Sequence, residues 1–360
     1  MNILIACTQY PYHGGAATNS YALVKALRKR GHNVCGLFFE NKTVDCDPDN
    51  IGGILSSKLQ INKESLRKNV INFFKGKPNI ILAKNYVAPI YCRKLFPNSK
   101  IVYLVSGSPL MVPLSRDGIS AIKYLSLMSL DIENKYGKEL PSSEAKAIKL
   151  SDAVLLNSEI SRQVFLKTYP KISKKCKIFS PLNTSMIINK SAKNQKEFQK
   201  RRIDIAFVCS SLSRTVKNAE FARKIFKHKS LKAKTKLVIG SGGKRFADIP
   251  NIIIKKKTNN KEVMKYLGQT KLVICTSFFD ASPNIVNEAI ASGCNILVSK
   301  NCGWSAKYGK ESVCNDVYNT GEWVRKIYYL CNNKVSYASL DSREKSLDKL
   351  EVLIHKVVKL

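Results

Sequence analysis

The sequence predicts an α/β protein made of two doubly wound domains. Short apolar segments rich in β-branched residues alternate with amphipathic segments of helical period along most of the 360 residues, which is typical of parallel sheets covered by helices. The length suits two ordinary domains, and 44% hydrophobic content is enough for a core in each. A polar, charged stretch separates the two series, so we expect domains at 1–182 and 203–339 with a linker at 183–202.

The first series starts with a strand at Asn2–Cys7, a loop that contains Gly14 and Gly15, and an amphipathic helix. Glycines between a strand and a helix let a ligand approach the backbone closely, although a tight turn explains them equally well. The G-x-G-x-x-G pattern of dinucleotide-binding folds is absent, which disfavours a nicotinamide enzyme. Ligands of doubly wound sheets bind beyond the carboxyl ends of the strands, so this loop is a candidate substrate site. Further strands of this series are expected at 34–39, 79–83, 100–105 and 153–157.

In the second series, two continuous apolar strands at 271–276 and 294–299 flank a helix. Ser282 is a suitable N-cap, and Pro283 suits the first helical position because its missing N–H would have no partner there. Gly293 suits the left-handed residue that ends a helix. Such a helix exposes first-turn amides, which together with the macrodipole attract anions, above all phosphate. The amides expected to be free belong to Asn284, Ile285 and Val286.

Two acidic residues accompany this helix start. Asp280 lies in the preceding loop, and Glu288 lies on the second turn of the expected helix. Ionised carboxylates accept hydrogen bonds, for example from sugar hydroxyls, while the helix N-terminus holds phosphate. The segment therefore predicts a sugar-nucleotide site, with an ordinary capped core helix as the alternative.

The net charge of +35 raises the possibility of nucleic-acid binding. The charge is concentrated at 171–261, where 25 basic residues face 4 acidic ones, but only 13 of the 61 basic residues in the chain are Arg. The planar guanidinium is the group that bidentate phosphate and base recognition favours, so dedicated nucleic-acid binding is disfavoured. A basic face on an anionic membrane, or an excess of Lys on solvated surfaces, remains open.

Targeting signals are not evident in the sequence. No run of about 18 apolar residues occurs, and the start lacks the basic n-region of a secretory signal. Eleven scattered cysteines without a C-x-x-C pair favour a reducing compartment. We expect a cytoplasmic protein, with peripheral association at the cytosolic face of a membrane as the option that the basic charge suggests.

An acidic run at Asp45, Asp47 and Asp49 is a candidate for a metal site, because alternate Asp residues can bind a divalent cation, and Asp280 with Glu288 could in principle form a second. Asp and Pro are also what surface turns use, and no Glu closes an EF-hand at the twelfth position. We therefore expect no metal.

The run D280-A-S-P-N-I-V-N-E288-A-I-A-S-G293 resembles the signature of retaining glycosyltransferase family four. The resemblance implies a GT-B fold, with two Rossmann-like domains that face each other across a cleft, and a last helix, here at 340–360, that packs back on the first domain. The apolar stripe of that helix needs such a partner. The family usually has Glu where this chain has Asp280, and it often has a His near the position of Ser106, where this chain has none.

The resemblance also implies roles for particular residues. Glu288 would accept hydrogen bonds from ribose hydroxyls and Asp280 from the transferred sugar. Arg214 and Lys217, which follow an expected strand at 203–208, would hold the donor diphosphate with the first-turn amides, because fixed cations must neutralise the leaving group when no metal does. Gly240 follows the next strand and joins the donor site, and the Gly14–Gly15 loop would close on the donor and the acceptor.

These expectations define a function. The chain is expected to be a metal-independent, retaining glycosyltransferase that moves a sugar from a nucleoside-diphosphate sugar to a hydroxyl of a glycan, lipid-linked or small-molecule acceptor. No cofactor is expected beyond the donor as co-substrate. The alternatives are a catalytically inactive sugar-nucleotide-binding module and a polyanion-binding protein.

Overall fold

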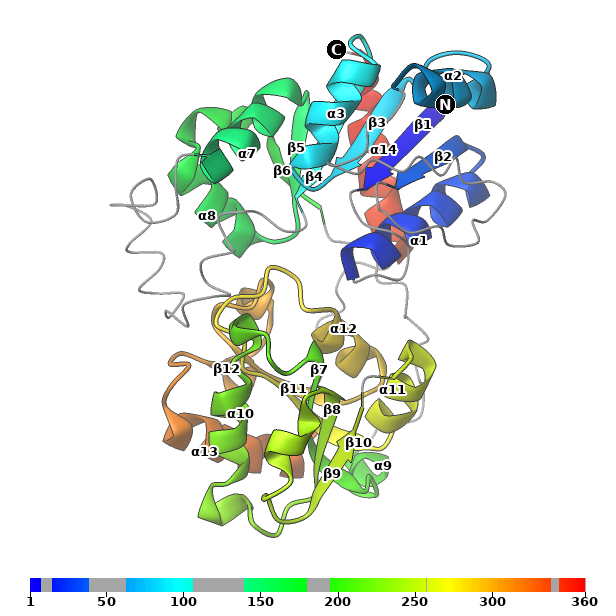
Figure 1. Cartoon of the computed structure of the whole chain (residues 1–360). Helices are drawn as coiled ribbons and strands as arrows, with labels where there is room; N and C mark the ends of the chain where they lie inside the picture. The colour runs from blue at the N-terminus through cyan, green and yellow to red at the C-terminus, as the bar shows by residue number, and fades with distance from the viewer. Residues whose placement is uncertain are drawn as a thin grey trace. The chain divides into compact units, whose positions relative to one another are not determined.

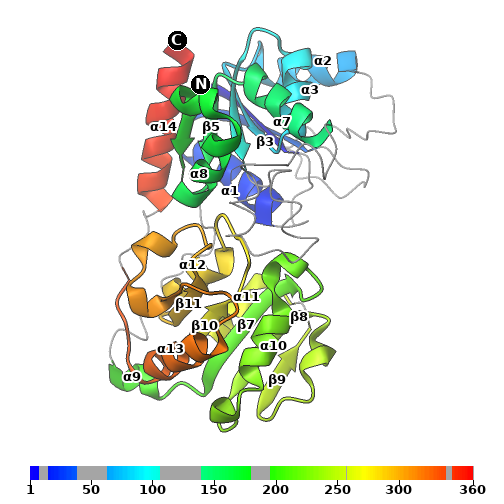
Figure 2. The same cartoon turned by 90° about the vertical axis from the view of Figure 1, so that its left-hand side faces the viewer.

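The computed structural model describes residues 1–7, 15–38, 63–105, 139–179, 195–256, 258–337 and 343–359. The described residues form two compact units, one built from residues up to Phe179 together with the last helix, and one built from residues 195–337 (Figure 1, Figure 2). Each unit contains one sheet of six parallel strands. Gly14, Ser106 and the Asp45, Asp47 and Asp49 run lie outside the described residues.

The first sheet has the strand order β2-β1-β3-β4-β5-β6. Every neighbouring pair is parallel, and the register places Ile5 beside Leu82 and Leu82 beside Val102. The strands are nearly continuous apolar runs, as expected for strands buried on both faces. Their bounds are β1 Asn2–Cys7, β2 Asn33–Phe38, β3 Ile80–Lys84, β4 Lys100–Val105, β5 Ala153–Leu156 and β6 Cys176–Ile178.

Helices cover both faces of this sheet. Helices α1 (Gly15–Lys29) and α14 (Arg343–Lys359) share one core with alternate residues of the strands, and α2 (Lys63–Phe74) and α3 (Val87–Leu95) share another with the remaining residues. The unit also contains α7 (Glu139–Leu150) and α8 (Glu159–Thr168).

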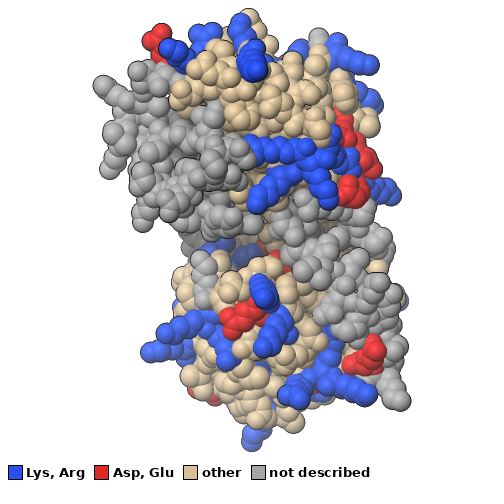
Figure 3. Space-filling model, turned by 90° about the vertical axis from the view of Figure 1, so that its right-hand side faces the viewer, with Lys and Arg blue, Asp and Glu red and all other residues tan. Residues whose placement is uncertain are grey.

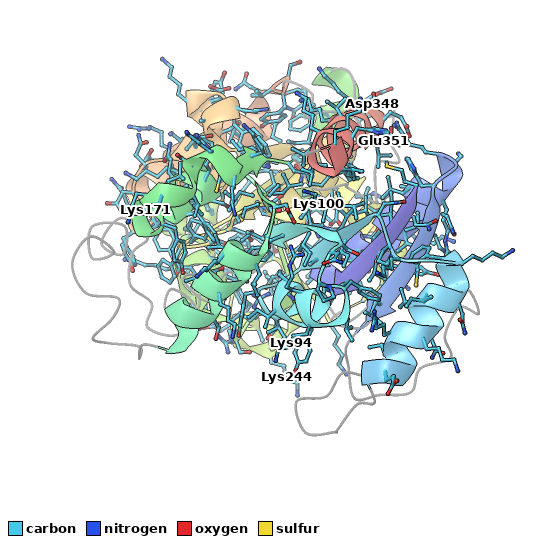
Figure 4. The ribbon with its side chains drawn as sticks, turned by 90° about the horizontal axis from the view of Figure 1, so that it is seen from above. Lys94, Lys100, Lys171, Lys244, Asp348 and Glu351 are labelled. Carbon is cyan, nitrogen blue, oxygen red and sulfur yellow. The ribbon has the colours of Figure 1, made fainter. Side chains whose placement is uncertain are left out.

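Helix α14 belongs to the first unit by packing and by charge. Its apolar stripe, which includes Leu350 and Ile354, is buried against the sheet beside α1. Arg30, at the end of α1, forms ion pairs with Asp348 at 2.7 Å and with Glu351 at 2.8 Å, two acidic residues of α14 that are labelled in Figure 4. A segment more than 300 residues away in sequence thus completes the core of the N-terminal unit.

The second sheet has the order β12-β11-β10-β7-β8-β9, again entirely parallel. Its strands are β7 Ile203–Ser211, β8 Lys236–Ser241, β9 Ile252–Lys255, β10 Thr270–Cys275, β11 Asn295–Ser299 and β12 Val313–Cys314. Helices α10 (Ala219–Phe226) and α13 (Thr320–Asn332) share one core with this sheet, and α11 (Asn260–Leu267) and α12 (Asn284–Ala291) share the core on the other face.

Two local features differ from the pattern that the sequence suggested. Strand β7 continues to Ser211, three residues beyond the expected end, because Ser211 pairs with Ser241 after an irregularity in the register. The stretch expected to be a polar linker contains the short helix α9 (Gln195–Gln199), and its Phe198 is fully buried beneath Lys334. Among the described helices, none combines the length and the apolar character needed to cross a membrane.

Candidate functional site

The candidate site lies at the carboxyl edge of the second sheet. From β7 the chain proceeds to β8 and β9 on one side of the sheet, and then returns to place β10, β11 and β12 on the other side. The strand order therefore reverses between β7 and β10, and such a switch point is where ligands of doubly wound sheets bind. Arg214 and Lys217 follow β7, and Asp280 follows β10, so three predicted residues meet this edge.

Lys217 and Asp280 form an ion pair at this edge, with the ammonium nitrogen against Asp280 Oδ2. Their side chains are 20% and 16% exposed. Burial on its own lowers the pKa of Lys217, but the adjacent carboxylate of Asp280 outweighs it, so the pKa lies well above its ordinary value. Lys217 is thus a permanent cation held in a defined place.

The backbone around Lys217 is fixed to the end of β10. Thr276 Oγ1 lies 3.0 Å from the carbonyl oxygen of Lys217 and 3.1 Å from that of Asn218, and it donates to these oxygens. The amide of Phe278 donates to the carbonyl oxygen of Val216 at 3.0 Å. The segments that follow β7 and β10 are therefore one connected layer.

Asp280 is fixed in turn to the segment that follows β11. Its amide donates to the carbonyl oxygen of Asn301 at 3.3 Å, and its carbonyl oxygen accepts from the amide of Gly303 at 2.7 Å. Its Oδ1 accepts from the amide of Ser282 at 3.3 Å. One carboxylate therefore serves both the ion pair with Lys217 and the turn that leads into α12.

The start of α12 differs from the prediction by one residue. Pro283 is the N-cap, with φ −69° and ψ 109°, and Ser282 does not cap the helix. The amide of Val286 donates to the carbonyl oxygen of Pro283 at 3.1 Å. The expectation that this amide is free was therefore wrong. The amides of Asn284 and Ile285 remain as the first-turn donors for which no described residue acts as acceptor.

The end of α12 is as predicted. Gly293 has φ 73°, and its amide donates to the carbonyl oxygen of Ile290 at 3.0 Å, while the amide of Cys294 donates to Ala289 at 2.9 Å. This pair of bonds is the Schellman motif. Glu288 is half-buried on the second turn, where its Oε1 accepts from Asn260 Nδ2 of α11 at 2.9 Å.

Gly240 has a structural role that its sequence position did not reveal. It has φ 154°, and a Cβ there would lie 2.3 Å from the carbonyl oxygen of Cys209 in β7. Only glycine lets β7 and β8 approach this closely near the carboxyl edge.

Arg214 lies just beyond the end of β7, and its side chain is exposed. Gly15 begins α1 in the first unit.

A group of buried polar atoms without partners marks the same edge. Six such atoms occur among the described residues, and all six lie between the carboxyl end of a strand and the first two turns of the next helix. Because buried polar groups are normally paired, these atoms are candidates for ligand contacts, and of their residues only Ser282 was expected from the sequence to bind substrate. They are Asn218 Nδ2, Ser282 Oγ, Asn287 Oδ1, Asn301 Nδ2, Trp304 Nε1 and Thr320 Oγ1.

The first sheet has its own switch point, between β1 and β3. Cys7 and Lys84 end these strands side by side. Lys84 is only 8% exposed, and burial lowers its pKa to about 8. The sequence analysis missed this residue, because the expected strand ended at Ala83 and a lysine after it reads as solvated.

The surface of the described residues is strongly basic, and these residues form no cluster of metal-ligating side chains. Lys and Arg side chains outnumber acidic ones on the face of both units that Figure 3 shows. Within the described residues, no three His, Cys, Asp or Glu side chains come together in a way that would hold a metal ion.

No protein-family model and no curated protein sequence matches this chain. Solved structures do match it along their whole length. WaaG, a glycosyltransferase involved in lipopolysaccharide biosynthesis, aligns with a TM-score of 0.64 and 12% identity over 99% of this chain and 94% of WaaG. HepE from Anabaena, in complex with UDP and glucose, aligns with a TM-score of 0.66 and 10% identity over 99% of this chain and 100% of HepE. A glycosyltransferase from Rickettsia africae aligns with a TM-score of 0.64 and 14% identity over 99% and 98% of the two chains.

At these identities the likeness concerns the fold. The neighbours are GT-B glycosyltransferases, and the two six-stranded parallel sheets described above are the architecture they share with this chain. The expected fold class is confirmed: the chain has the GT-B fold, with two Rossmann-like, doubly wound sheets.

Proposed function

We propose that this chain is a glycosyltransferase that moves a sugar from a nucleoside-diphosphate sugar to a hydroxyl acceptor, with retention and without a metal ion. The observation that carries the proposal is the Lys217–Asp280 pair, fixed at the switch point beside the start of α12. It is supported by fold neighbours solved with UDP and glucose and with UDP-2-fluoro glucose.

The chemistry of sugar transfer matches the groups at this edge. A nucleoside diphosphate gains negative charge as it leaves, and prearranged cations and N–H donors stabilise that charge. Lys217 and Arg214 supply the cations, and the amides of Asn284 and Ile285 supply the donors. Lys217 is well suited to this role because its pKa is raised, so it never loses its proton under physiological conditions.

The two carboxylates take the hydroxyl groups of the donor. Asp280 keeps one oxygen on Lys217 and the other on the amide of Ser282, and each oxygen has a further lone pair for a sugar hydroxyl. Glu288, held by Asn260, accepts from the ribose. With attack on the face from which the phosphate departs, the departing phosphate itself takes the acceptor's proton, so retention requires no separate base.

We assign the acceptor to the first unit in this proposal, with Gly14 and Gly15 as the contacts that the sequence suggests. The excess of basic residues favours a glycan or lipid-linked acceptor at the cytosolic face of an anionic membrane. A vesicle sedimentation assay with anionic and neutral lipids tests this preference independently of turnover.

A donor screen tests the function. UDP-, GDP- and ADP-sugars are added to the protein in EDTA, and the unfolding temperature is measured. A ligand at 100 times its dissociation constant stabilises by about 2.7 kcal/mol, which produces a clear shift. We expect one nucleotide class to stabilise the wild type and K271A, in which a similarly buried Lys–Asp pair at the opposite edge of the sheet is removed, but not K217A. Failure of every donor to bind the wild type would overturn the proposal.

A further inference from the structure

Asn218 stands out among the residues of the carboxyl edge. It lies between Lys217 and α10, and it has the left-handed conformation with φ 53° and ψ 48°. Its side chain is inside the protein, with only 7% of the residue exposed, yet Nδ2 has no hydrogen-bond partner. The residue thus combines an unusual backbone with an unpaired buried donor.

The local fold gains little from this arrangement. Asn at an N-cap usually accepts a hydrogen bond from the amide two or three residues later, which stabilises a helix, but Asn218 caps α10 without any such bond. Its carbonyl oxygen is held by Thr276 Oγ1 at 3.1 Å and accepts from the amide of Ala222 at 3.2 Å. The backbone is therefore well anchored, whereas the side-chain amide is prepared for a partner that the chain does not supply.

The surroundings of Asn218 indicate an anionic partner. Nδ2 can only donate. Lys217 precedes it directly, Arg214 lies four residues before it, and the N-terminus of the eight-residue helix α10 carries no side-chain cap. A helix N-terminus with its positive dipole end and unpaired amides favours phosphate. Two acids lie nearby, and both are already paired: Asp280 with Lys217, and Glu220, in the first turn of α10, with Arg245 at 2.9 Å.

We propose that Asn218 donates its side-chain amide to a phosphoryl oxygen of the donor's diphosphate, at a second helix N-terminus that complements that of α12. The inference rests on the proposed function and adds a binding residue to it. Two phosphate groups then have two helix starts, α10 after β7 and α12 after β10, on the two sides of the switch point.

Asn218→Gly is the sharpest test, because glycine adopts φ 53° without strain and removes the side chain with its amide group. Asn251→Gly is the matched control. Asn251 also has φ 53°, but it is exposed at the amino end of β9 and its Nδ2 donates to the carbonyl oxygen of Lys232 at 3.2 Å. Binding of UDP, GDP and ADP is measured by titration calorimetry at one fixed salt concentration.

We expect N218G to weaken the preferred nucleotide about tenfold, which corresponds to about 1.4 kcal/mol, while N251G binds as the wild type does. Both variants should unfold close to the wild-type temperature. Asn218→Asp, which has the same shape but places a carboxylate at the phosphate, should lose more affinity than N218G. Inorganic pyrophosphate, which has neither base nor ribose, serves as a competitor, and N218G should weaken its binding by the same factor as it weakens nucleotide binding.

Equal binding by N218G and N251G would overturn the assignment of Asn218 and leave the proposed function intact. If N218G weakens nucleotide binding but leaves competition by pyrophosphate unchanged, Asn218 contacts another part of the donor. This result would also overturn the assignment. Absence of binding by the wild type to all three nucleotides would instead overturn the proposed function itself.

Discussion

The two edges of the second sheet hold buried charge in opposite ways. At the amino edge, the guanidinium of Arg201 donates to the carbonyl oxygens of Leu267, Thr270 and Ser292 and contacts Cys294 Sγ at 3.5 Å. All these contacts join the strand and helix ends into one layer. Arg201 is 8% exposed, and its donors are used by the protein itself.

Two lysines at the amino edge are equally well satisfied. Lys236 Nζ donates to the carbonyl oxygens of Lys234 at 2.7 Å and Pro250 at 3.1 Å. Lys271 pairs with Asp204 at 3.0 Å, and these side chains are 13% and 15% exposed. The carboxyl edge has a pair of similar burial in Lys217 and Asp280, but it also has the six unpaired polar atoms described above.

The difference distinguishes charged side chains that stabilise the fold from charged side chains that are available to bind a ligand. Burial and charge are alike at both edges, and what differs is whether the neighbouring donors and acceptors are complete. The amino edge even has a hollow of about 420 Å³ lined by Arg201 and Lys200, but the donors of Arg201 are already occupied. The carboxyl edge, where buried polar atoms lack partners, is therefore the candidate site, and the amino edge with its hollow is not.

The largest expected effect separates the two ion pairs. Lys217→Ala should lower kcat by about 10³, because removing one preorganised charge partner from a leaving group costs roughly that much. Lys271→Ala should leave kcat within about threefold of the wild type and should instead lower the unfolding temperature. Steady-state kinetics and thermal unfolding of both variants provide the comparison. Equal kinetic losses would mean that the two edges do not differ in function.

A second prediction concerns the carboxylate on α12. Glu288→Ala should weaken donor binding about a hundredfold, since a charged hydrogen-bond acceptor for two ribose hydroxyls is lost. Glu288→Gln should lose less, because one acceptor remains. Glu262→Ala, on the neighbouring helix α11, is the control, and its donor affinity should not change. Wild-type affinity in a folded E288A protein would remove this residue from the donor site.

The sequence identified the repeated strand–helix pattern well because burial of both sheet faces requires apolar runs. Most strand bounds, such as Asn2–Cys7 and Lys100–Val105, agree with the structure to within a residue or two. The start of α12 was wrong by one residue, because Pro283 combines its fixed φ with an extended ψ and so becomes the cap. Such a choice between neighbouring turns depends on tertiary contacts, here those of Asp280.

Apart from Ser282, the residues of the unpaired buried atoms had no sequence signal. Asn218 and Asn301 are ordinary turn residues in sequence, and only the packed structure shows that their amide groups are buried without partners. Lys84 was missed for a related reason, since a lysine after an apolar strand usually reaches solvent. The place of Lys217 and Asp280 at one edge of the sheet was thus predictable, whereas the completeness of the hydrogen bonding around them was not.

The third prediction extends the comparison to the carboxyl edge of the first sheet. The pKa of Lys84 is lowered from 10.5 to about 8 by burial, so between these values the unfolded chain binds more protons than the folded one. Stability contributed by Lys84 therefore rises with pH over this window, by up to about 3 kcal/mol. Lys84→Met should reduce this rise, as measured by urea unfolding at pH 7.5 and 9.5, while Lys236 and Lys334, whose pKa values burial also lowers, still contribute to it. Lys100→Met on β4 should keep the full rise, and a rise of wild-type size in K84M would contradict the assignment.

The smallest expected effect is that of a chelator. Mg²⁺ in phosphate sites is usually held by one or two carboxylates and the phosphates, but Asp280 already has Lys217 on one oxygen and the amide of Ser282 on the other. Lys217, Arg214 and the first-turn amides of α12 supply positive charge for the diphosphate, so a metal ion would duplicate them. Turnover in EDTA should therefore stay within about a factor of two of the metal-supplemented rate, a difference well below 1 kcal/mol in the barrier. EDTA could instead lower turnover a hundredfold, with Mg²⁺ or Mn²⁺ restoring the rate of the wild type but not that of a protein with Asp45 and Asp47 changed to Ala. This result would show that a metal ion, and not the Lys217 edge, neutralises the charge of the diphosphate.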